Sequence, residues 1–455
     1  MKEFTFSAFV YERSVPMGDK LSKLSSVFKK DGIRVAAGKA ARYTKRALKK
    51  HFRLAYKSDF GKNRSTYLSL INEALKGDHD RILVWRGSFG WNVPLFQRPQ
   101  HIARSLSRQN CLVFYEVTSM TDDVTAIEKY SENLYLVNFD NSYVSSLLFS
   151  AIDGSGKPKY LQFASTDWTM TREYVESFVR KGYNVLYEYI DEISSSLSGT
   201  KDIPKNIIEK YEYAMKSPDK VCIAATAEAL VNDVKSKRGD ANLALSTNGV
   251  DYDFFKTFDK NFEHDDGFKE LLNCGKYLVC YYGAMAKWID YDIIKAVAED
   301  GRFTVVLFGV RYDDSLERSG VLELENVRFF GAKKYEELKY YARETDVLTI
   351  PFVINDITKA TSPLKLFEYM ALGKPIVTTA MNECMKYDTP LIAHSRDEFV
   401  PLLNEAIAKK SDAEYISALD KEARDNSWDN KADDILSMLR SAENTCIDNI
   451  NDSDL

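Results

Sequence analysis

The sequence contains few cysteines, and their spacing excludes the sites that cysteines most often build. Six of the 455 residues are cysteine, spread from Cys111 to Cys446, and no two of them form a C-x-x-C pair. Paired spacings of that kind mark structural zinc sites, and small secreted domains use dense cysteines as a disulfide framework. We therefore expect reduced thiols, most of them buried, in a cytoplasmic protein.

Long apolar runs, a signal sequence and a strong net charge are also missing. No stretch of about 18 uninterrupted apolar residues is present, so no membrane-spanning helix is predicted. The first residues, MKEFTFSAFVYERSVP, lack the basic-then-apolar layout of a signal peptide. A formal net charge of −5 excludes the overall basic character of a nucleic-acid-binding chain. These absences predict a cytoplasmic chain with no nucleic-acid partner.

The N-terminal 79 residues form a basic extension with a composition of its own. Lysine and arginine are frequent from residue 20 to residue 64, and only Asp31 and Asp59 oppose them there. Apolar residues at helical spacing in VAAGKAARYTKRALKKHFRLAYK predict a helix. Such an extension is a solvated arm, a helix that binds anionic lipid at the inner face of the cytoplasmic membrane, or a helix that docks a partner. The sequence leaves these three open, and the oligomeric state as well.

Strands and helices alternate in two series along the rest of the chain. Strands of the first series are predicted at 81–85, 111–117, 133–139, 159–164, 184–190 and 220–226. Those of the second are predicted at 276–283, 303–309, 327–331, 346–352 and 374–379, and residues 247–270 between the series have the character of a linker. The order strand–helix–strand favours parallel sheets, and 455 residues suit two domains. We expect an α/β protein with two Rossmann-like domains.

The most informative stretch is PFVINDITKATSPLKLFEYMALGKPIVTT, residues 351–379. Ser362 suits a helix N-cap, Pro363 suits the first helical position, and Gly373 suits the end of the helix. The start of this helix, from Ser362 to Leu364, follows a predicted strand. Its free N–H groups and positive dipole end would bind a diphosphate.

Two charged side chains on the same helix extend this interpretation. Lys365 lies in the first turn and can add a positive charge beside the phosphates, and Glu368 can accept both hydroxyls of a ribose. The alternative is that Lys365 and Glu368 form an ordinary i,i+3 pair on a helix surface.

These residues resemble the donor-binding region of GT-B glycosyltransferases, above all the family 4 type. The pattern P-x-K-x-x-E-Y-x-A-x-G-K-P-V-V of that region is matched from Pro363 to Val377. Other segments agree in order, and they are NGVDYDFF (248–255), YYGAMAKWIDYDII (281–294), NVRFFGAKKYEELKYYARETDVLTIPF (326–352) and FQRPQHIARSL (96–106). The last resembles the opening of the acceptor domain in one bacterial surface-polysaccharide subgroup. The likeness covers about residues 80–440.

The resemblance implies a GT-B fold in which two Rossmann-like domains face each other across a cleft. It implies an acceptor-side domain at 80–250, a nucleotide-sugar domain at 251–425, and a crossover helix with a tail at 426–455. The implied activity is hexosyl or deoxyhexosyl transfer from a UDP-, dTDP- or GDP-linked sugar to a glycan or lipid-linked glycan, in cell-surface polysaccharide synthesis. Retention of the anomeric configuration is implied, with no cofactor and no metal, because basic groups and helix dipoles offset the charge of the leaving diphosphate.

The chain departs from the family pattern at one position. Family 4 enzymes usually carry two glutamates eight positions apart, and the first of them falls at Ala360. The subgroup resembled here uses an N-x-x-T loop, which Asn355 and Thr358 match, and their side chains are expected to bond the donor sugar. The identity of that sugar is left open by this departure, as are the donor base, the acceptor and the linkage.

Further donor-side candidates lie where strands end in the second series. Gly283 and Gly309 follow two predicted strands, and Arg311 comes directly after them as a candidate phosphate contact. No D-x-D sequence near a strand end requires a metal ion, because Asp251 and Asp253 belong to the NGVDYDFF segment.

The acceptor-side candidates lie in the first series. Arg98 and His101 flank the start of a helix, and His101 either positions or deprotonates an acceptor hydroxyl or caps the helix. Asp191 follows a strand as a candidate base, unless it is only the acidic start of a helix. Asp167 and Trp168 follow another strand and form either a sugar-contacting surface or part of the core.

Two rival functions remain. A GT-B sugar-nucleotide epimerase or phosphorylase would share the donor residues. A non-catalytic glycan- or nucleotide-binding module would also suit the missing first glutamate at Ala360.

Overall fold

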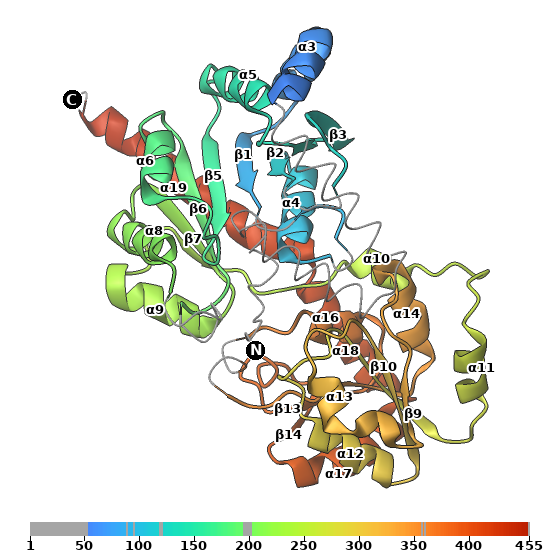
Figure 1. Ribbon diagram of the computed structural model, residues 1–455. Helices are drawn as coiled ribbons and strands as arrows, with labels where there is room; N and C mark the ends of the chain where they lie inside the picture. The colour runs from blue at the N-terminus through green and yellow to red at the C-terminus, as the bar shows by residue number, and fades with distance from the viewer. Residues whose placement is uncertain are drawn as a thin grey trace. The chain divides into compact units, whose positions relative to one another are not determined.

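The computed structural model describes residues 53–87, 90–93, 96–117, 122–193, 203–355, 358 and 361–453 (Figure 1). The described chain divides into two compact units. Unit 1 holds the described residues up to Ala225, Val231–Leu245 and the C-terminal residues from Ala432. Unit 2 holds Thr226–Leu230 and Ser246–Lys431. Most of the basic extension, residues 20–52, lies outside the described residues.

Unit 1 is built on an eight-stranded sheet. Its strand order is β3-β4-β2-β1-β5-β6-β7-β8, and all neighbours are parallel except β3 and β4. The central strands are buried apolar runs, as parallel strands covered on both faces require. The strands are β1 (Arg81–Arg86), β2 (Cys111–Glu116), β3 (Ile127–Ser131), β4 (Leu134–Val137), β5 (Lys159–Ala164), β6 (Asn184–Tyr189), β7 (Val221–Ala225) and β8 (Leu243–Leu245).

Helices connect these strands. They are α3 (Arg53–Lys76), α4 (Arg98–Arg108), α5 (Ser142–Asp153), α6 (Arg172–Val179), α8 (Lys205–Lys216) and α9 (Glu228–Arg238). The helix α3 belongs to the basic extension and lies beside α5, with the rings of Phe60 and Tyr143 stacked at 5.5 Å (Figure 1). Because Ile71 and Ala74 of α3 are buried, this part of the extension is packed onto the sheet unit.

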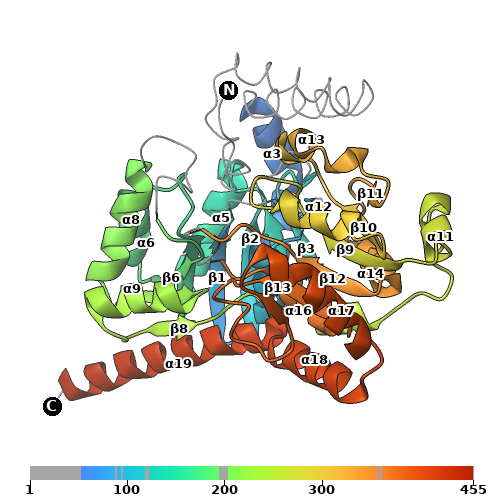
Figure 2. The same cartoon turned by 90° about the horizontal axis from the view of Figure 1, so that it is seen from below.

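The C-terminal helix α19 (Trp428–Ser453) starts in unit 2 and continues as part of unit 1. Figure 2 shows it as one long helix. In unit 1 the guanidinium of Arg81 donates to both carboxylate oxygens of Glu443, at 3.0 and 3.2 Å, and Tyr160 donates to Oε1 at 2.9 Å. Arg81 is 3% exposed, so this ion pair is buried on the side of β1.

Unit 2 is built on a six-stranded sheet with the order β11-β10-β9-β12-β13-β14, and every neighbouring pair is parallel. Its strands are β9 (Tyr277–Tyr282), β10 (Phe303–Phe308), β11 (Val327–Phe329), β12 (Val347–Ile350), β13 (Ile376–Thr379) and β14 (Leu391–Ala393). Its helices and 3-10 turns are α10 (Tyr252–Lys256), α11 (Asp266–Leu272), α12 (Tyr291–Glu299), α13 (Ser315–Ser319), η2 (Val321–Glu323), α14 (Tyr335–Glu344), α16 (Leu364–Ala371), η3 (Arg396–Glu398), α17 (Phe399–Lys409) and α18 (Ala413–Asp425).

The expected α/β class and all eleven expected strands are confirmed, with ends that differ by one or two residues. The short edge strands β3, β8 and β14 were not expected. The interpretation of residues 247–270 as a linker is wrong, because this segment forms α10 and α11 and buries Phe255 and Phe268 in the core of unit 2. Within the described ranges, no helix is both long enough and apolar enough to span a membrane.

Substituting Glu443 by alanine tests the ion pair that fixes α19 to unit 1. The change leaves the buried Arg81 guanidinium without its bidentate partner, so we expect a loss of about 3 kcal/mol in the free energy of unfolding. Urea unfolding followed by circular dichroism measures this loss. The matched control is Asn444→Ala at the neighbouring exposed position, which should change stability by less than about 0.5 kcal/mol. Equal stability of the two variants would contradict a structural role for the pair.

Candidate functional site

The turns after β9 and β10 leave no room for side chains. Gly283 and Gly309 have φ angles of +148° and +147°, which side chains rarely allow. A Cβ atom on Gly309 would lie 1.6 Å from the carbonyl oxygen of Gly283, and one on Gly283 would lie 2.2 Å from Cε of Lys365. The two turns and the side chain of Lys365 are therefore in direct contact. No side chain fits at Gly309, whose Cβ would meet backbone atoms, and a Cβ at Gly283 would have to displace the end of Lys365.

The start of α16 differs from the expectation. Pro363, with ψ 114°, is the N-cap residue and not the first helical residue, and no side chain caps the helix. Ser362 is therefore not the N-cap, because its carbonyl is held by Nδ2 of Asn248 at 2.8 Å, one residue before the helix. The Ser362 hydroxyl is buried and has no hydrogen-bond partner among the described residues. Gly373 ends the helix at φ +65°, as expected.

With respect to the described residues, the start of α16 has two backbone donors without an acceptor. No acceptor among the described residues takes the backbone N–H groups of Leu364 and Lys365. The amine of Lys365 lies 5.8 Å from the ring centre of Tyr281, and loss of water around it lowers its pKa, against the effect of the Glu368 charge. An anion placed here would meet two N–H groups, a hydroxyl and an ammonium group.

Glu368 is buried one turn further along α16. Its Oε2 accepts a hydrogen bond from the Tyr282 hydroxyl at 2.7 Å, and its Oε1 accepts one from Tyr335 at 3.0 Å. Burial raises the pKa of Glu368 to about 7, although both hydrogen bonds and the Lys365 charge act in the opposite direction. Because Glu368 is 2% exposed, the alternative of a surface pair with Lys365 is wrong.

Asn355 and Thr358 are brought together after β12. The backbone N–H of Asn355 donates to Oγ1 of Thr358 at 2.9 Å, and the backbone N–H of Thr358 donates to Oδ1 of Asn355 at 3.0 Å. The two side chains thus hold their own loop in a reciprocal pair, which resembles a capping box. A contact with a donor sugar stays a prediction. Ala360 lies outside the described residues.

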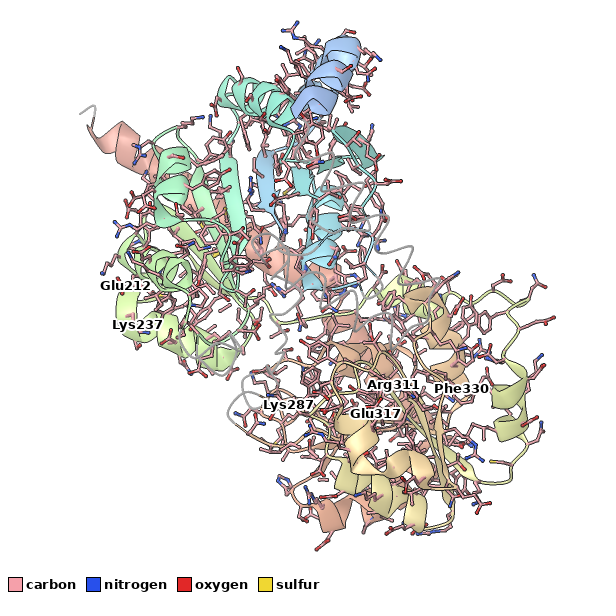
Figure 3. The ribbon with its side chains drawn as sticks, in the orientation of Figure 1. Glu212, Lys237, Lys287, Arg311, Glu317 and Phe330 are labelled. Carbon is pink, nitrogen blue, oxygen red and sulfur yellow. The ribbon has the colours of Figure 1, made fainter. Side chains whose placement is uncertain are left out.

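Arg311 follows Gly309 at the same sheet edge. Figure 3 shows it close to Glu317, with which it forms an ion pair at 3.4 Å, and its guanidinium lies 5.0 Å from the ring centre of Phe329. Both charged side chains are about half exposed, so the pair is weak and can be replaced by a phosphate. Lys287 is held through its backbone N–H by Asp313 at 3.0 Å.

In unit 1, Arg98 is buried in an ion pair. Its Nε donates to Oε1 of Glu188 at 3.1 Å, and Nε2 of Gln162 donates to Oε2 of Glu188 at 2.9 Å. Glu188 is fully buried, and burial raises its pKa against the effect of Arg98. Arg98 therefore ties the start of α4 to the centre of the sheet, at strands β5 and β6.

His101 is buried on α4, with its ring 4.9 Å from that of Phe96 in an edge-to-face contact. Burial, together with the charges of Arg104 and Arg108, holds its pKa well below the usual range. The imidazole is neutral at pH 7 and 2% exposed. It is a weak base as placed here, and its role toward an acceptor stays a prediction.

Asp167 is not part of a surface. Its Oδ1 accepts hydrogen bonds from the N–H and hydroxyl of Thr169 at 2.6 and 2.8 Å and from the N–H of Met170 at 3.2 Å, and it pairs with the buried Lys210 at 3.6 Å. Burial alone would raise its pKa, but the Lys210 charge and these hydrogen bonds lower it. The expected sugar contact is therefore replaced by a buried turn. Trp168 beside it is half-buried.

Asp191 follows β6 and has a different environment. It is half-buried, and no described side chain forms a hydrogen bond or ion pair with its carboxylate. Burial raises the pKa of Asp191 to about 7. A carboxyl group with this pKa can exchange a proton near neutral pH, as general acid–base catalysis requires.

Comparison with known proteins gives matches over both units. Residues 277–409, in unit 2, match the family described as glycosyl transferases group 1. TuaH of Bacillus subtilis, named as a teichuronic acid biosynthesis glycosyltransferase, is 25% identical over 206 residues, which are 43% of this chain and 50% of TuaH. The match spans about half the length of that relative.

Solved structures resemble most of the chain. Trehalose 6-phosphate synthase of Burkholderia multivorans aligns with a TM-score of 0.58 and 12% identity, over 81% of this chain and 100% of its own. Sucrose-phosphate synthase of Thermosynechococcus elongatus gives 0.55 and 14%, over 81% and 100%. Anabaena HepE, solved with UDP and glucose, gives 0.52 and 13%, over 80% and 100%. At these identities the likeness is one of fold.

The chain has the GT-B fold of these solved structures, and residues 277–409 match the glycosyl transferases group 1 family. The fold class expected from the sequence is confirmed. Within the described part of this protein, no group of three or more His, Cys, Asp or Glu side chains could hold a metal ion.

Sequence reasoning missed three groups that shape the candidate sites of this protein. They are the hydroxyls of Tyr282 and Tyr335, and the carboxylate of Glu188. Glu188 had a signal, because it is a charged residue inside the apolar run NVLYEYI, and a charge inside a buried strand needs a partner. The tyrosines had none, since nothing in a sequence shows which hydroxyls reach a distant carboxylate.

Substituting Gly283 by alanine tests the position of Lys365. The new Cβ would overlap Cε of Lys365, so the flexible lysine must leave the turn. We expect a folded protein whose affinity for nucleotide diphosphate falls at least about tenfold, or 1.4 kcal/mol. The control Gly301→Ala also places alanine at a positive φ, +80°, with nothing within 4 Å. Calorimetric titration with UDP and GDP measures both, and unchanged affinity in Gly283→Ala would exclude Lys365 from the site.

Proposed function

We propose that this chain transfers a hexosyl or deoxyhexosyl group from a nucleotide diphosphate sugar to a glycan or lipid-linked glycan. The observation that carries the proposal is the stack of Gly283, Gly309 and Lys365 at the start of α16, with a buried carboxylate, Glu368, one turn further on. This arrangement offers a cation and N–H groups for the two phosphates, followed by a carboxylate that can accept hydrogen bonds from the ribose hydroxyls. The diphosphate and the ribose follow each other in the same order in a nucleotide diphosphate.

Each part of the donor is assigned to residues of unit 2. The diphosphate meets Lys365, the N–H groups of Leu364 and Lys365, the Ser362 hydroxyl, and Arg311 once it leaves Glu317. The ribose meets Glu368. The transferred sugar meets the Asn355–Thr358 loop. Protein groups thus offset the charge that develops on the leaving diphosphate, so we propose a reaction that needs neither a metal ion nor a cofactor. The resemblance to family 4 enzymes is the ground on which we propose that the anomeric configuration is retained.

On the acceptor side, Asp191 is the stronger candidate for a proton-transfer group. Its pKa of about 7 allows it to take the proton of an acceptor hydroxyl, whereas the buried His101 is a poorer base. Arg98 acts by holding α4 against Glu188 and not by contact with the acceptor.

The relatives support the biological setting of the proposal. TuaH is named for teichuronic acid biosynthesis, and HepE was solved with UDP and glucose. These names favour a role in bacterial surface-polysaccharide synthesis and a UDP-linked donor, with dTDP- and GDP-linked sugars as the alternatives.

The test is a thermal-shift screen against UDP-, dTDP- and GDP-linked sugars in excess EDTA. A ligand at 100 times its Kd adds about 2.7 kcal/mol of stability, which is easily detected. We expect one nucleotide class to stabilise the protein, and the Glu368→Gln variant to bind it at least about tenfold more weakly, because one charge-assisted acceptor is lost. Glu336→Gln, an exposed carboxylate of α14, is the matched control.

The positive donor is then incubated with and without polysaccharide acceptors, and the anomer of the product is determined by NMR. Turnover without any acceptor would favour an epimerase. Binding without turnover would favour a non-catalytic module. Loss of activity in EDTA, restored by Mg²⁺, would contradict a metal-independent reaction.

We also propose that the basic extension contacts the inner face of the cytoplasmic membrane. Residues 20–52 are outside the described part, but Lys57, Lys62 and Arg64 are exposed on α3. Each suitably placed cation near anionic lipid contributes about 1 kcal/mol, and salt screens this attraction.

Removing residues 1–52 should weaken salt-sensitive binding to anionic vesicles, although Lys57, Lys62 and Arg64 remain on α3, and should leave donor binding unchanged. The deletion ends before α3, because Ile71 and Ala74 are buried and removal of α3 would uncover apolar surface. Co-sedimentation with phosphatidylglycerol vesicles at low and high salt measures the effect, with neutral vesicles as the control. If the full chain does not bind anionic vesicles at low salt, the membrane proposal is wrong, and a partner-docking helix or a solvated arm is left.

A further inference from the structure

The Glu368 carboxylate is held from two sides by tyrosines of different elements. Tyr282 is the last residue of β9 and donates to Oε2, and Tyr335 is the first residue of α14 and donates to Oε1. Each oxygen thus has one tyrosine donor. Two independent donors fix both the position and the rotation of the carboxylate plane.

Tyr335 is itself held in place by aromatic packing. Its ring stacks on Phe254 at 5.2 Å with an interplanar angle of 8°, and Phe255 meets it edge-on at 6.0 Å. Lys339, one turn along α14, donates to the carbonyl oxygens of Phe254 and Thr257 at 2.6 and 2.5 Å. The segment α10 is therefore fixed against α14, and the hydroxyl of Tyr335 has a defined direction.

Tyr282 is fixed in a different way. It is buried, and its ring meets that of Tyr369 edge-on at 5.0 Å. Tyr369 follows Glu368 directly on α16, so the strand end and the helix are locked together around the carboxylate.

The number of hydrogen-bond acceptor positions on the Glu368 carboxylate indicates which class of nucleotide it can bind. An ionised carboxylate has about four lone-pair positions, two on each oxygen. The two tyrosines occupy one position on each oxygen, and no other described group bonds either oxygen, so a ligand that reaches this buried carboxylate would meet one position on each oxygen. The 2′- and 3′-hydroxyls of a ribose are two neighbouring donors that match these positions, and a 2′-deoxyribose supplies only one of them.

We infer that Tyr282 and Tyr335 are positioning residues that fit Glu368 to the vicinal diol of a ribonucleotide, so that the donor is a ribonucleotide diphosphate sugar and not a dTDP-linked one. This inference rests on the proposed donor site. It narrows that proposal, because a ribonucleotide-specific site excludes one of the three donor classes that the sequence left open.

The charge of Glu368 gives a second readout. The titratable groups around the carboxylate are Tyr282 on β9, Tyr335 on α14, and Lys365 and Tyr369 on α16. A protonated carboxyl group loses an acceptor position, so nucleotide binding should weaken as the pH falls through the pKa of Glu368, about 7. The Tyr335 hydrogen bond lowers that pKa, and its removal should therefore shift the decline in binding to higher pH.

The experiment compares Tyr335→Phe with the wild-type protein by calorimetric titration. The substitution keeps the ring on Phe254 and removes only the hydroxyl. The probes are UDP, 2′-deoxy-UDP, dTDP, GDP and 2′-deoxy-GDP, each from pH 6 to pH 8.5. The matched control is Tyr340→Phe on the same helix, because the Tyr340 hydroxyl accepts from the N–H of Asp259 and does not reach Glu368.

We expect the wild-type protein to bind the ribonucleotide at least about tenfold more tightly than its 2′-deoxy form. Tyr335→Phe should weaken ribonucleotide binding about five- to tenfold and 2′-deoxynucleotide binding less than about twofold, because the lost hydroxyl oriented a carboxylate that bonds both ribose hydroxyls only in the ribonucleotide. Its binding should also decline at a higher pH than that of the wild type. The nucleotide phosphate titrates in the same way in experiments with every variant. A difference in the pH profile of binding between variants therefore reports the protonation of Glu368.

The outcomes separate the inference from the proposed function. Equal affinity for the ribo and 2′-deoxy forms, or tighter binding of dTDP, overturns the inference and leaves the donor site intact. An unchanged preference and an unchanged pH profile in Tyr335→Phe also overturn it. If the wild-type protein binds none of the five nucleotides, the proposed function and the inference both fail.

Discussion

The donor side of this protein depends on one close approach between backbone and side chain. The turns after β9 and β10 touch each other at Gly283 and Gly309, and the aliphatic stem of Lys365 lies where a Cβ on Gly283 would be. This contact brings the start of α16 to the carboxyl ends of two central strands, where ligands of open parallel sheets bind. Glu368 lies in the interior because it is one helical turn further along, and its charge there requires donors, which Tyr282 and Tyr335 provide.

The requirement that a buried charge has a partner also accounts for the charged side chains inside unit 1. Arg98 pairs with Glu188, Lys210 with Asp167, and Arg81 with Glu443, and all are buried apart from Glu443, which is 17% exposed. Buried ion pairs add little net stability because both charges lose their water, but a lone member is costly, so the pairs fix geometry. They anchor α4, the turn after β5, and α19. Asp191 is different because burial raises its pKa to about 7 while no described basic side chain pairs with it, and this separates a candidate for proton transfer from groups that hold structure.

The sequence predictions were correct where neighbouring residues determine a feature, and wrong where residues distant in the sequence determine it. The central strands were predictable because a buried parallel strand is a local apolar run, whereas β3, β8 and β14 lie at sheet edges and are mostly exposed or half-buried, so they give no such signal. Gly373 was predictable as a local helix end, but the cap at Ser362 was not, because Asn248, 114 residues earlier, holds its carbonyl. Asp167 follows a strand in the sequence like Asp191 does, and only the position of Lys210 distinguishes them. The donor motif was found by the spacing of its residues. Its tyrosine partners were not found, because they come from other elements of the fold.

The segment between the two series shows how far such distant causes extend. Asn248 bonds the carbonyl of Ser362 at the start of α16, and Phe254 stacks on Tyr335, which bonds Glu368 one turn along the same helix. Asp251 caps α10 by accepting from the N–H of Phe254, and so sets the direction of that ring. Seven residues of one short segment thus support both the expected phosphate end and the expected ribose end of the site. A segment that makes two such contacts in unit 2 is therefore part of the framework of the candidate donor site.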